Sequence, residues 1–257
     1  MAKIFCIANQ KGGVGKTTTT VNLCAGLAKL GQRVLMVDLD PQGNATQGSG
    51  IDKRNLEYSV YDVLLDDVAI VTAKNRSDTC GYDVLGANRD LAGAEVELVT
   101  QTNREKRLKT ALSMVQSDYD FVLIDCPPSL NMLTLNGLCS ANGVIVPMQC
   151  EYFALEGLSD LVNTIKQVHA NLNRDLELIG LLRVMFDNRI TLQRQVSDQI
   201  KAHFGNKVFD TVIPRNVRLA EAPSYGLPGV IFDPAARGSQ AFVEFAQEMV
   251  NRIDTMR

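Results

Sequence analysis

Short runs of apolar residues recur along the chain, separated by longer segments that mix apolar and polar positions. The strongest runs are nearly continuous in Val, Ile, Leu and Phe and do not alternate with polar residues. Strands that are covered by helices on both faces have this continuous pattern. Buried strands are therefore predicted at residues 4–9, 33–40, 119–127, 143–149, 176–186 and 207–214, with a weaker candidate at 82–87.

The segments between these runs have the spacing of helices. Helices are predicted at residues 15–30, 103–117, 154–171, 191–204 and 237–254. The regular order of strand, helix and strand predicts an α/β fold, with a doubly wound, mostly parallel sheet flanked by helices. Residues 43–60 are rich in Gly, Asn and Ser, and we expect a surface loop that leads into an inserted element. The chain, residues 1–257, is thus expected to form a single domain.

Composition narrows the class of protein. Of the 257 residues, 46% are hydrophobic and 21% are charged, and a core of this size needs no disulfide or structural metal. The six cysteines form no C-x-x-C pair and there are two histidines, so we expect buried thiols in a reducing cytoplasm and no zinc site. No signal peptide or membrane-spanning run is expected either. The net charge is −3, so any contact with nucleic acid requires a local basic patch.

The stretch "KGGVGKTT" (residues 11–18) lies between the first predicted strand and the first predicted helix. It follows the phosphate-loop pattern G-x-x-x-x-G-K-[ST], except that Gln10 occupies the first glycine position. The glycines let the backbone N–H groups surround an anion, Lys16 is placed for the β- and γ-phosphates, and the Thr17 hydroxyl is placed for Mg²⁺. The nucleotide-binding residues predicted from this loop are Lys11, Gly12, Gly13, Val14, Gly15, Lys16, Thr17 and Thr18.

Carboxylates follow two of the predicted strands. Asp125 ends the run "FVLID" and is expected at the carboxyl edge of the sheet, where it would hold Mg²⁺ through water. The alternative is an aspartate that caps the next helix. Asp38 and Asp40 end the second strand, and both would face the nucleotide if the strand continues that far. Asp40 is favoured as the residue that activates the attacking water, although an aspartate that forms a turn before Pro41 remains the alternative.

Several longer segments resemble one family. "KGGVGKTT", "VDLDPQGNAT", "DCPPSL", "QCEYFALEGL" and "IPRNVRLAEAPSYG" together resemble the ParA/Soj chromosome- and plasmid-partition ATPases. These are members of the deviant Walker A group of P-loop ATPases, which also contains MinD and the nitrogenase iron protein. The resemblance extends from residue 3 to about residue 240, and the last two segments are its most specific part.

The resemblance implies a function and a set of partners. It implies a cytoplasmic, nucleoid-associated ATPase with ATP and Mg²⁺ as cofactors and with the fold of a P-loop NTPase. With ATP bound, two subunits would close into a sandwich homodimer that binds double-stranded DNA without sequence preference. A ParB-type centromere-binding protein would stimulate hydrolysis and release the dimer, and no stable membrane association is expected.

The resemblance also assigns roles to single residues. Lys11 would reach the phosphates bound by the partner subunit, and Gly12 would lie where the two loops approach each other. Lys11, Lys16 and Asp40 would be catalytic. From the residues alone, Lys11 is equally well explained as a solvated lysine before a glycine turn, although a charge supplied from a second subunit is a known accelerator of phosphoryl transfer.

The C-terminal half carries further predicted contacts. By resemblance, Asn188, Pro214 and Arg215 approach the adenine, and Arg189 and Arg218 lie on the DNA-binding face. A small basic patch is doubled in a two-fold dimer, which would make DNA binding depend on ATP. The alternative for both arginines is ordinary solvated surface.

Three other functions compete with this interpretation. A membrane-associated, MinD-like ATPase that positions cell division needs a basic amphipathic C-terminal helix, but the tail "FVEFAQEMVNRIDTMR" has acidic residues among its basic ones. An electron-transfer ATPase needs cysteines placed to share an iron–sulfur cluster. A regulator without turnover is expected to carry an N-terminal helix-turn-helix domain, for which the position of the phosphate loop, at residue 11, leaves no room.

Overall fold

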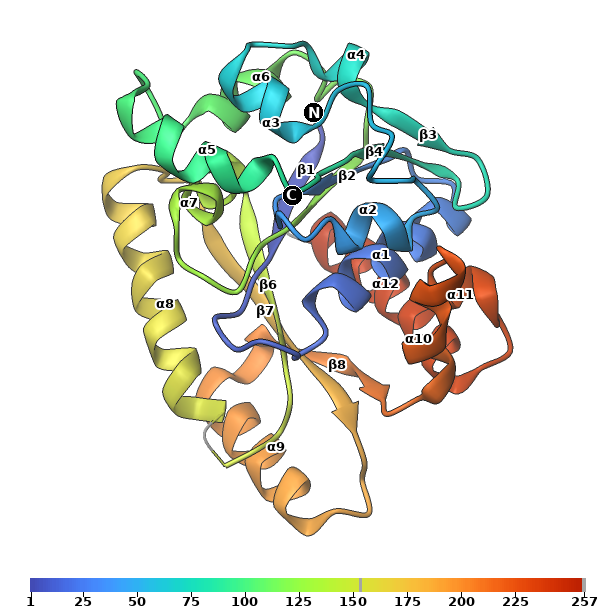
Figure 1. The fold of residues 1–257 in the computed structure, drawn as a ribbon. Coiled ribbons are helices and arrows are strands. Elements are labelled where there is room, and N and C mark those ends of the chain that lie inside the picture. Colours follow the sequence, from blue (N-terminus) through green and yellow to red (C-terminus); the bar gives the residue numbers. More distant parts are fainter. Residues whose placement is uncertain (153, 256–257) are drawn as a thin grey trace.

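A single sheet of eight strands, in the order β3-β4-β2-β5-β1-β6-β7-β8, forms the centre of the computed structural model, which describes residues 1–152 and 154–255 (Figure 1). Neighbouring strands are parallel except for β3 and β4, which are antiparallel. The strands are β1 (Lys3–Ile7), β2 (Val34–Asp38), β3 (Asn75–Ser77), β4 (Tyr82–Leu85), β5 (Phe121–Asp125), β6 (Gly143–Met148), β7 (Glu177–Phe186) and β8 (Val208–Pro214). The predicted α/β fold and its mostly parallel sheet are confirmed.

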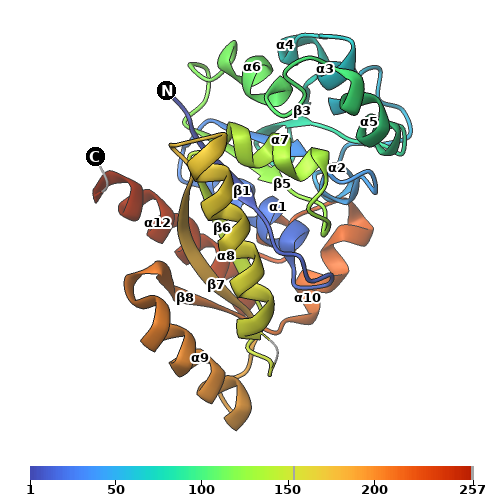
Figure 2. The same ribbon diagram turned by 90° about the vertical axis from the view of Figure 1, so that its left-hand side faces the viewer.

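Helices cover both faces of the sheet (Figures 1 and 2). One face carries α1 (Lys16–Lys29), α2 (Asn44–Gly48), α10 (Val217–Glu221), α11 (Gly229–Phe232) and α12 (Arg237–Thr255). The other carries α3 (Val60–Leu65), α4 (Ile70–Ala73), α5 (Leu91–Glu97), α6 (Arg107–Ser113), α7 (Met132–Ser140), α8 (Ala154–Asn171) and α9 (Thr191–Phe204). Short 3₁₀ turns lie at Leu98–Thr100, Gly205–Lys207 and Ala222–Tyr225.

Each central strand contributes to two separate hydrophobic cores. In β1, Phe5 and Ile7 face the core under α1 and α12, whereas Ile4 and Cys6 face the core under α7 and α8. Successive side chains of a strand point to opposite faces, so a strand between two helical layers must be apolar at every position. This is the physical reason for the continuous apolar runs in the sequence.

Helices α1 and α12 approach each other closely at Gly26. A Cβ atom at this position would lie 2.9 Å from Cβ of Ala246 and 3.2 Å from the carbonyl oxygen of Phe242. The apolar stripe of α12, including Phe245 and Met249, is buried in the same core. This packing holds α1, and with it the loop at its N-terminus, against the sheet.

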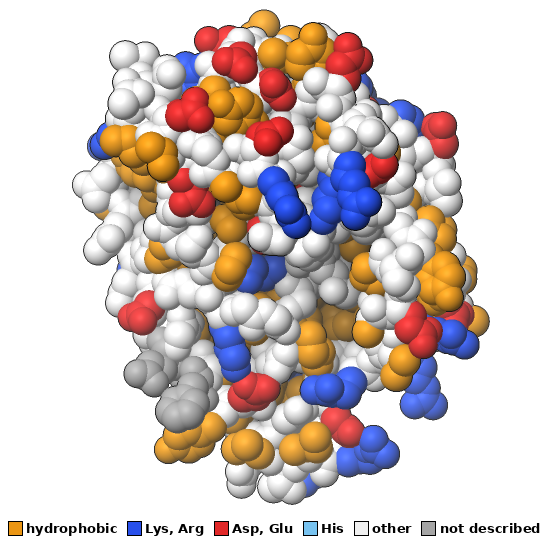
Figure 3. Space-filling view, in the orientation of Figure 1, with side chains coloured by type: hydrophobic (Ala, Val, Ile, Leu, Met, Phe, Trp, Pro, Cys, Tyr) orange, Lys and Arg blue, Asp and Glu red, His pale blue; other side chains and the backbone are white. Residues whose placement is uncertain are grey.

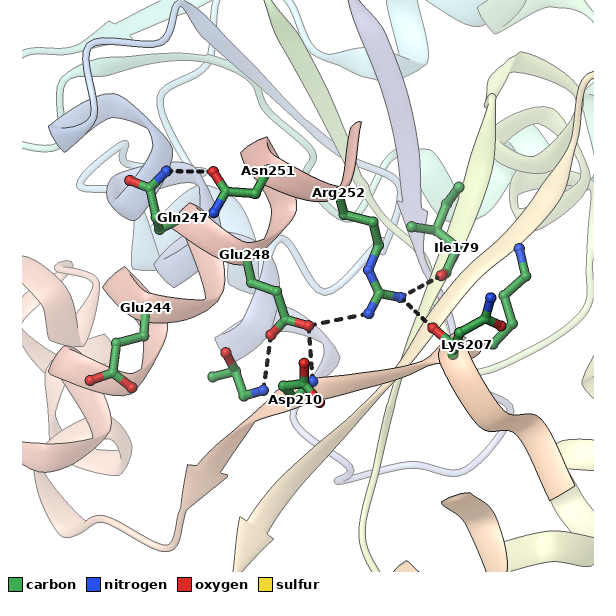
Figure 4. A pocket seen from close by; sticks show the side chains of 10 residues that line it. Ile179, Lys207, Asp210, Glu244, Gln247, Glu248, Asn251 and Arg252 are labelled. Carbon is green, nitrogen blue, oxygen red and sulfur yellow. Dashed lines mark hydrogen bonds and ion pairs between the residues drawn. The ribbon is translucent and has the colours of Figure 1, made fainter. Parts of the chain in front are cut away.

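Strand β8 is an edge strand, and α12 satisfies part of its free backbone. The Glu248 carboxylate accepts hydrogen bonds from the N–H groups of Asp210 and Thr211, each at 2.9 Å, where β8 bulges away from β7 (Figure 4). Arg252 binds Glu248 and stacks over the Phe209 ring. An open groove of about 830 Å³ runs along this edge and shares no lining residue with the nucleotide pocket described below.

Several local predictions were wrong. Residues 43–60 are not one irregular loop, because they contain α2 and the first residue of α3. The helix expected at 103–117 extends only over Arg107–Ser113. Strand β3 and helices α3, α4, α5, α7, α10 and α11 were not predicted, since segments of three to nine residues are too short for a clear periodicity. In the family motif at 149–158 Phe153 lies outside the described residues, as do Met256 and Arg257 of the tail.

Candidate nucleotide-binding site

The loop between β1 and α1 forms an open cradle. Gly13 and Gly15 have positive φ angles of 72° and 77°, a conformation that residues with a side chain rarely adopt. Gly15 is the N-cap of α1, so the free N–H groups and the positive dipole end of this helix face the cradle. At Gly12 and Gly13 a Cβ atom would meet no other atom within 4 Å. Val14 is buried behind the loop. The backbone therefore has the shape and polarity of an anion site.

Lys16 begins α1 and turns back over this loop. Its Nζ donates a hydrogen bond to the carbonyl oxygen of Lys11 at 3.1 Å. Burial lowers the pKa of Lys16, and the nearby carboxylates of Asp125 and Asp40 oppose that effect. A phosphate in the cradle would offer this ammonium group a charged partner in place of a neutral carbonyl.

Thr17 and Asp125 meet at the centre of the site. The Thr17 and Thr20 hydroxyls each donate a hydrogen bond of 2.8 Å to one of the two carboxylate oxygens of Asp125. Asp125 is fully buried at the end of β5. Burial raises the pKa of Asp125 to about 7, the neighbouring Asp38 adds to this, and the two threonine hydroxyls oppose it. The prediction that Asp125 lies beside the loop at the carboxyl edge of the sheet agrees with this geometry.

The oxygen donors of Thr17 and Asp125 suit Mg²⁺, which prefers hard oxygen ligands and retains water molecules. Among the described residues, no group of three or more His, Cys, Asp or Glu side chains could hold a metal ion. A cation here would need further oxygen ligands from the nucleotide, as in other phosphate-loop sites. Thr17 would bind it directly and Asp125 would orient Thr17 or a bound water.

Asp38 and Asp40 differ in burial and in hydrogen-bond partners. Strand β2 ends at Asp38 and does not reach Asp40, so the condition under which both carboxylates were predicted to face the nucleotide is not met. The Asp38 carboxylate is fully buried and accepts hydrogen bonds from N–H and Oγ1 of Thr46 and from the N–H of Asp40. Burial raises the pKa of Asp38 to about 6, although these hydrogen bonds act to lower it. Asp40 is half-buried beyond the strand and accepts a hydrogen bond from the N–H of Gln42.

A pocket of about 280 Å³ lies beside the loop, between α1 and the ends of β7 and β8. Three of the predicted nucleotide-binding residues, Thr18, Pro214 and Arg215, line it, whereas Asn188 is not among its lining residues. Its walls are mostly apolar, and Met185, which holds a strained φ of 51°, forms one of them. Size, position and apolar character suit a nucleotide base.

Lys11 does not point into its own cradle. Its Nζ forms an ion pair of 2.5 Å with Oε2 of Glu151, and both side chains are about half-exposed. Gln149, two residues earlier, donates a hydrogen bond to the carbonyl oxygen of Gly13 at 3.2 Å. Neither Gln149 nor Glu151 was predicted as a site residue, although both belong to the motif "QCEYFALEGL" that carries the family resemblance.

The comparisons with known proteins agree with this geometry. A family model described as an AAA domain matches residues 2–178. The chain is 52% identical to the sporulation initiation inhibitor protein Soj of Bacillus subtilis, over 97% of this chain and 98% of that protein. It is 48% identical to the chromosome partitioning protein ParA of Caulobacter vibrioides, over 97% and 94% of the two chains. The chain belongs to the ParA/Soj family of ATPases. The predicted family and enzyme class are confirmed.

Solved structures place this ParA/Soj ATPase among nucleotide-binding relatives. A Mycobacterium smegmatis protein, described as cobyrinic acid a,c-diamide synthase, is 41% identical with a TM-score of 0.87, and the match covers 100% of this chain and 97% of that one. That protein was solved with ADP and magnesium and also with an ATP analogue and magnesium. The cell division ATPase MinD of Pyrococcus furiosus, 24% identical with a TM-score of 0.79, shares the fold. The predicted cofactors, ATP and Mg²⁺, are those of the family.

The two arginines predicted to bind DNA lie on loops and helix ends of the ParA/Soj chain that follow β7 and β8. Arg189 is exposed and donates two hydrogen bonds to Asp187, which hold the pKa of that carboxyl at about 2. Arg218 is paired with Glu221 and Asp233. Each predicted contact therefore already has an acidic neighbour within its own subunit. Within the described part of the chain, no helix combines the length and apolarity that crossing a bilayer requires.

Proposed function

We propose that this protein is a DNA-partition ATPase that dimerises with ATP, binds DNA without sequence preference as the dimer, and is released when hydrolysis is stimulated. The observation that carries the proposal is the position of Lys11. Its ammonium lies outside the cradle of its own subunit and stays accessible, while Lys16 occupies the cradle. Lys11 can contact bound phosphates if they belong to a second subunit that faces this loop.

Within one subunit the loop holds ATP and prepares its terminal phosphate for transfer to water. Lys16 and the loop N–H groups bind the phosphates, and Thr17 with Asp125 holds the cation. When bound, Mg²⁺ supplies positive charge at the phosphate oxygens. Asp40 accepts the proton of the attacking water or orients it, and its N–H group is fixed by Asp38. Thr18, Pro214 and Arg215 contact the base, and Asn188 is proposed as a contact from outside the pocket wall.

Exposed apolar side chains support a dimer seam on this side of the molecule. Leu130, Tyr152, Ile190 and Val217 are exposed and follow the carboxyl ends of β5, β6, β7 and β8, respectively. The carboxyl ends of parallel strands share one edge, which is also the edge that carries the phosphate loop. The open space at Gly12 is consistent with close approach of a second loop there.

DNA binding by single subunits would be weak. On the face in Figure 3, blue side chains form small separate groups, several of them beside red ones, and the net charge of the chain is −3. A dimer brings two copies of Arg189 and Arg218 to one surface, and phosphate oxygens would replace Asp187, Glu221 and Asp233 as partners. Affinity for DNA falls steeply with salt in proportion to the number of phosphate contacts, so doubling that number has a large effect.

DNA co-sedimentation tests the proposal. Wild type, Lys16→Ala and Arg189→Glu are compared with ATP, with ADP and without nucleotide. Binding is expected only for wild type with ATP. Arg174→Glu is the matched charge reversal, because Arg174 is exposed just before β7, at the opposite edge of the sheet, and it should bind like wild type. Equally strong binding without nucleotide would reject the ATP-dependent switch.

The partner and the location follow from the same proposal. A ParB-type protein bound at centromere-like sites would stimulate hydrolysis at the dimer, and the ATP form would be found on the nucleoid in the cytoplasm. Stimulation is measured as ATP turnover with DNA and the ParB-type protein, each alone and together. Lys11→Ala should bind ATP but form no stable dimer and show no stimulation.

A MinD-like membrane role is the alternative. It requires an amphipathic helix whose apolar face is free to enter a bilayer. In α12, Phe242, Phe245, Met249 and Ile253 are buried against the sheet, which supports the DNA-based function. Sedimentation with anionic liposomes and ATP tests this, and ATP-dependent co-sedimentation would favour the membrane role.

A further inference from the structure

The segment that follows β6 contacts the phosphate loop through side chains. Gln149 binds the carbonyl oxygen of Gly13, and Glu151 binds the Lys11 ammonium. Both contacts join side chains of this segment to the loop. The motif "QCEYFALEGL" thus has a structural relation to Lys11 that neither the nucleotide site nor the proposed DNA contacts explain.

Both ends of the Lys11–Glu151 pair are held by their backbones. The N–H of Lys11 donates to Oδ1 of Asn9, and Nδ2 of Asn9 donates to the carbonyl oxygen of Pro147 in β6. The N–H of Glu151 donates to the carbonyl oxygen of Gln149 at 3.0 Å. Asn9 thus ties the loop to β6, and a tight turn directly after β6 carries Glu151, so little backbone freedom remains to be lost when the pair forms.

We propose that Glu151 is a positioning residue for Lys11, which it retains in its own subunit until the phosphates of a second subunit displace it. This inference rests on the proposed ATP dimer. In a single subunit the Lys11 ammonium is then already paired, and each dimer that forms must break two Lys11–Glu151 pairs. The pair sets a threshold that a highly charged triphosphate exceeds more readily than a diphosphate does.

The threshold has a measurable size. Exposed ion pairs contribute little individually, and the loss of two corresponds to a change of about 2-fold to about 30-fold in an equilibrium constant. Glu151→Gln should therefore lower the dimer dissociation constant by a factor in this range, with the ATP analogue and with ADP alike, because the pair is broken in either dimer. Nucleotide affinity of the single subunit should not change.

Sedimentation equilibrium with a non-hydrolysable ATP analogue, and separately with ADP, tests this. Glu151→Gln is compared with wild type and with Glu244→Gln, a matched change at an exposed position of α12. The difference in dimer dissociation constant between Glu151→Gln and wild type should become smaller between about 50 mM and about 300 mM salt, because salt screens exposed ion pairs. A dimer of Glu151→Gln that is as weak as wild type, or weaker, overturns the inference, since a weaker dimer would place Glu151 in the seam itself.

Lys11 variants separate this inference from the proposed function. If Lys11→Ala dimerises like wild type, the proposed role of Lys11 between subunits fails. If Lys11→Ala is monomeric but Glu151→Gln behaves like wild type, only the inference on Glu151 fails. The double variant should match Lys11→Ala, because no pair remains to be released, and a recovered dimer would show that Glu151 acts on something other than Lys11.

Discussion

The Thr17 hydroxyl at the start of α1 donates a 2.8 Å hydrogen bond to Asp125 at the end of β5, and the Thr20 hydroxyl binds the other oxygen of the same carboxylate. The two threonines differ in position, because Thr20 is fully buried whereas Thr17 is half-buried beside the loop. This difference allows the metal role of the site to be separated from its role in folding.

Thr17→Ala should lower Mg²⁺-dependent ATP turnover by about 10-fold to about 100-fold, the usual effect of removing a group that holds or orients a metal ligand. Thr20→Ala should keep its Mg²⁺ dependence and lose about 1–3 kcal/mol of stability, because the buried Thr20 hydroxyl contacts both the Asp125 carboxylate and the Lys16 carbonyl oxygen. Turnover is measured against Mg²⁺ concentration, and stability by urea unfolding. Equal loss of Mg²⁺ dependence in both variants would contradict the assignment of Thr17.

Asp40→Ala should bind ATP with unchanged affinity and lose about 10²-fold to about 10⁴-fold in turnover, the range for a residue that moves a proton in the transition state. Single-turnover hydrolysis and calorimetric ATP titration measure the two effects. Asp38→Asn is the comparison. It should instead destabilise the fold by about 1–3 kcal/mol, because Thr46 and Asp40 lose a buried charged acceptor. Wild-type turnover in Asp40→Ala would remove Asp40 from the mechanism.

Two helical glycines should respond in opposite ways to substitution by alanine. Gly26→Ala should destabilise the protein by about 1–3 kcal/mol, since the new methyl group would overlap Ala246 and the Phe242 backbone. Gly157→Ala in α8 should stabilise it by about 0.5–1 kcal/mol, because the position is exposed, helical and free of neighbours within 4 Å. Urea midpoints measure both, and a stabilised Gly26→Ala would show that the two helices can separate at little cost.

The surroundings of Asp83 lead us to expect that part of the folding stability depends on pH. Burial alone would raise the pKa of Asp83, but hydrogen bonds from Lys74, Tyr119 and Arg76 outweigh it and hold the pKa below the usual value of 3.8. A lowered folded-state pKa adds stability that is fully present above the unfolded-state pKa and is lost as pH falls through the folded-state pKa.

Asp83→Asn should therefore cost about 2 kcal/mol at pH 7, from the loss of charged hydrogen bonds. The cost should be the same at pH 5 and should shrink below about pH 4. Urea unfolding of both proteins from pH 7 to pH 3 measures it. A difference between the two proteins that stays constant down to pH 3 would mean that the Asp83 charge does not contribute.

Much of the fold could be predicted because its signals are local. A strand between two helical layers must be apolar throughout, and a phosphate loop needs its glycines, lysine and threonine within a few residues. The seven predicted strand segments all contain strands of the sheet for this reason, and Lys16 and Thr17 lie where their spacing indicated. Strand β3 and helices α2, α3, α4 and α5 were missed, because such short elements depend on tertiary contacts, as α2 does on the contact between Asp38 and Thr46.

The sequence by itself determined the class of fold, the phosphate loop and, through its longer motifs, the family. The tertiary structure decided which side chains meet across long separations: Thr17 with Asp125, Asp38 with Thr46, and Lys11 with Glu151. Residues 140 positions apart carry no spacing signal, because their distance depends on which strands become neighbours. The adjacency of β1 and β6 brings Glu151 to Lys11, and so the state of the lysine in a single subunit is a property of the folded chain.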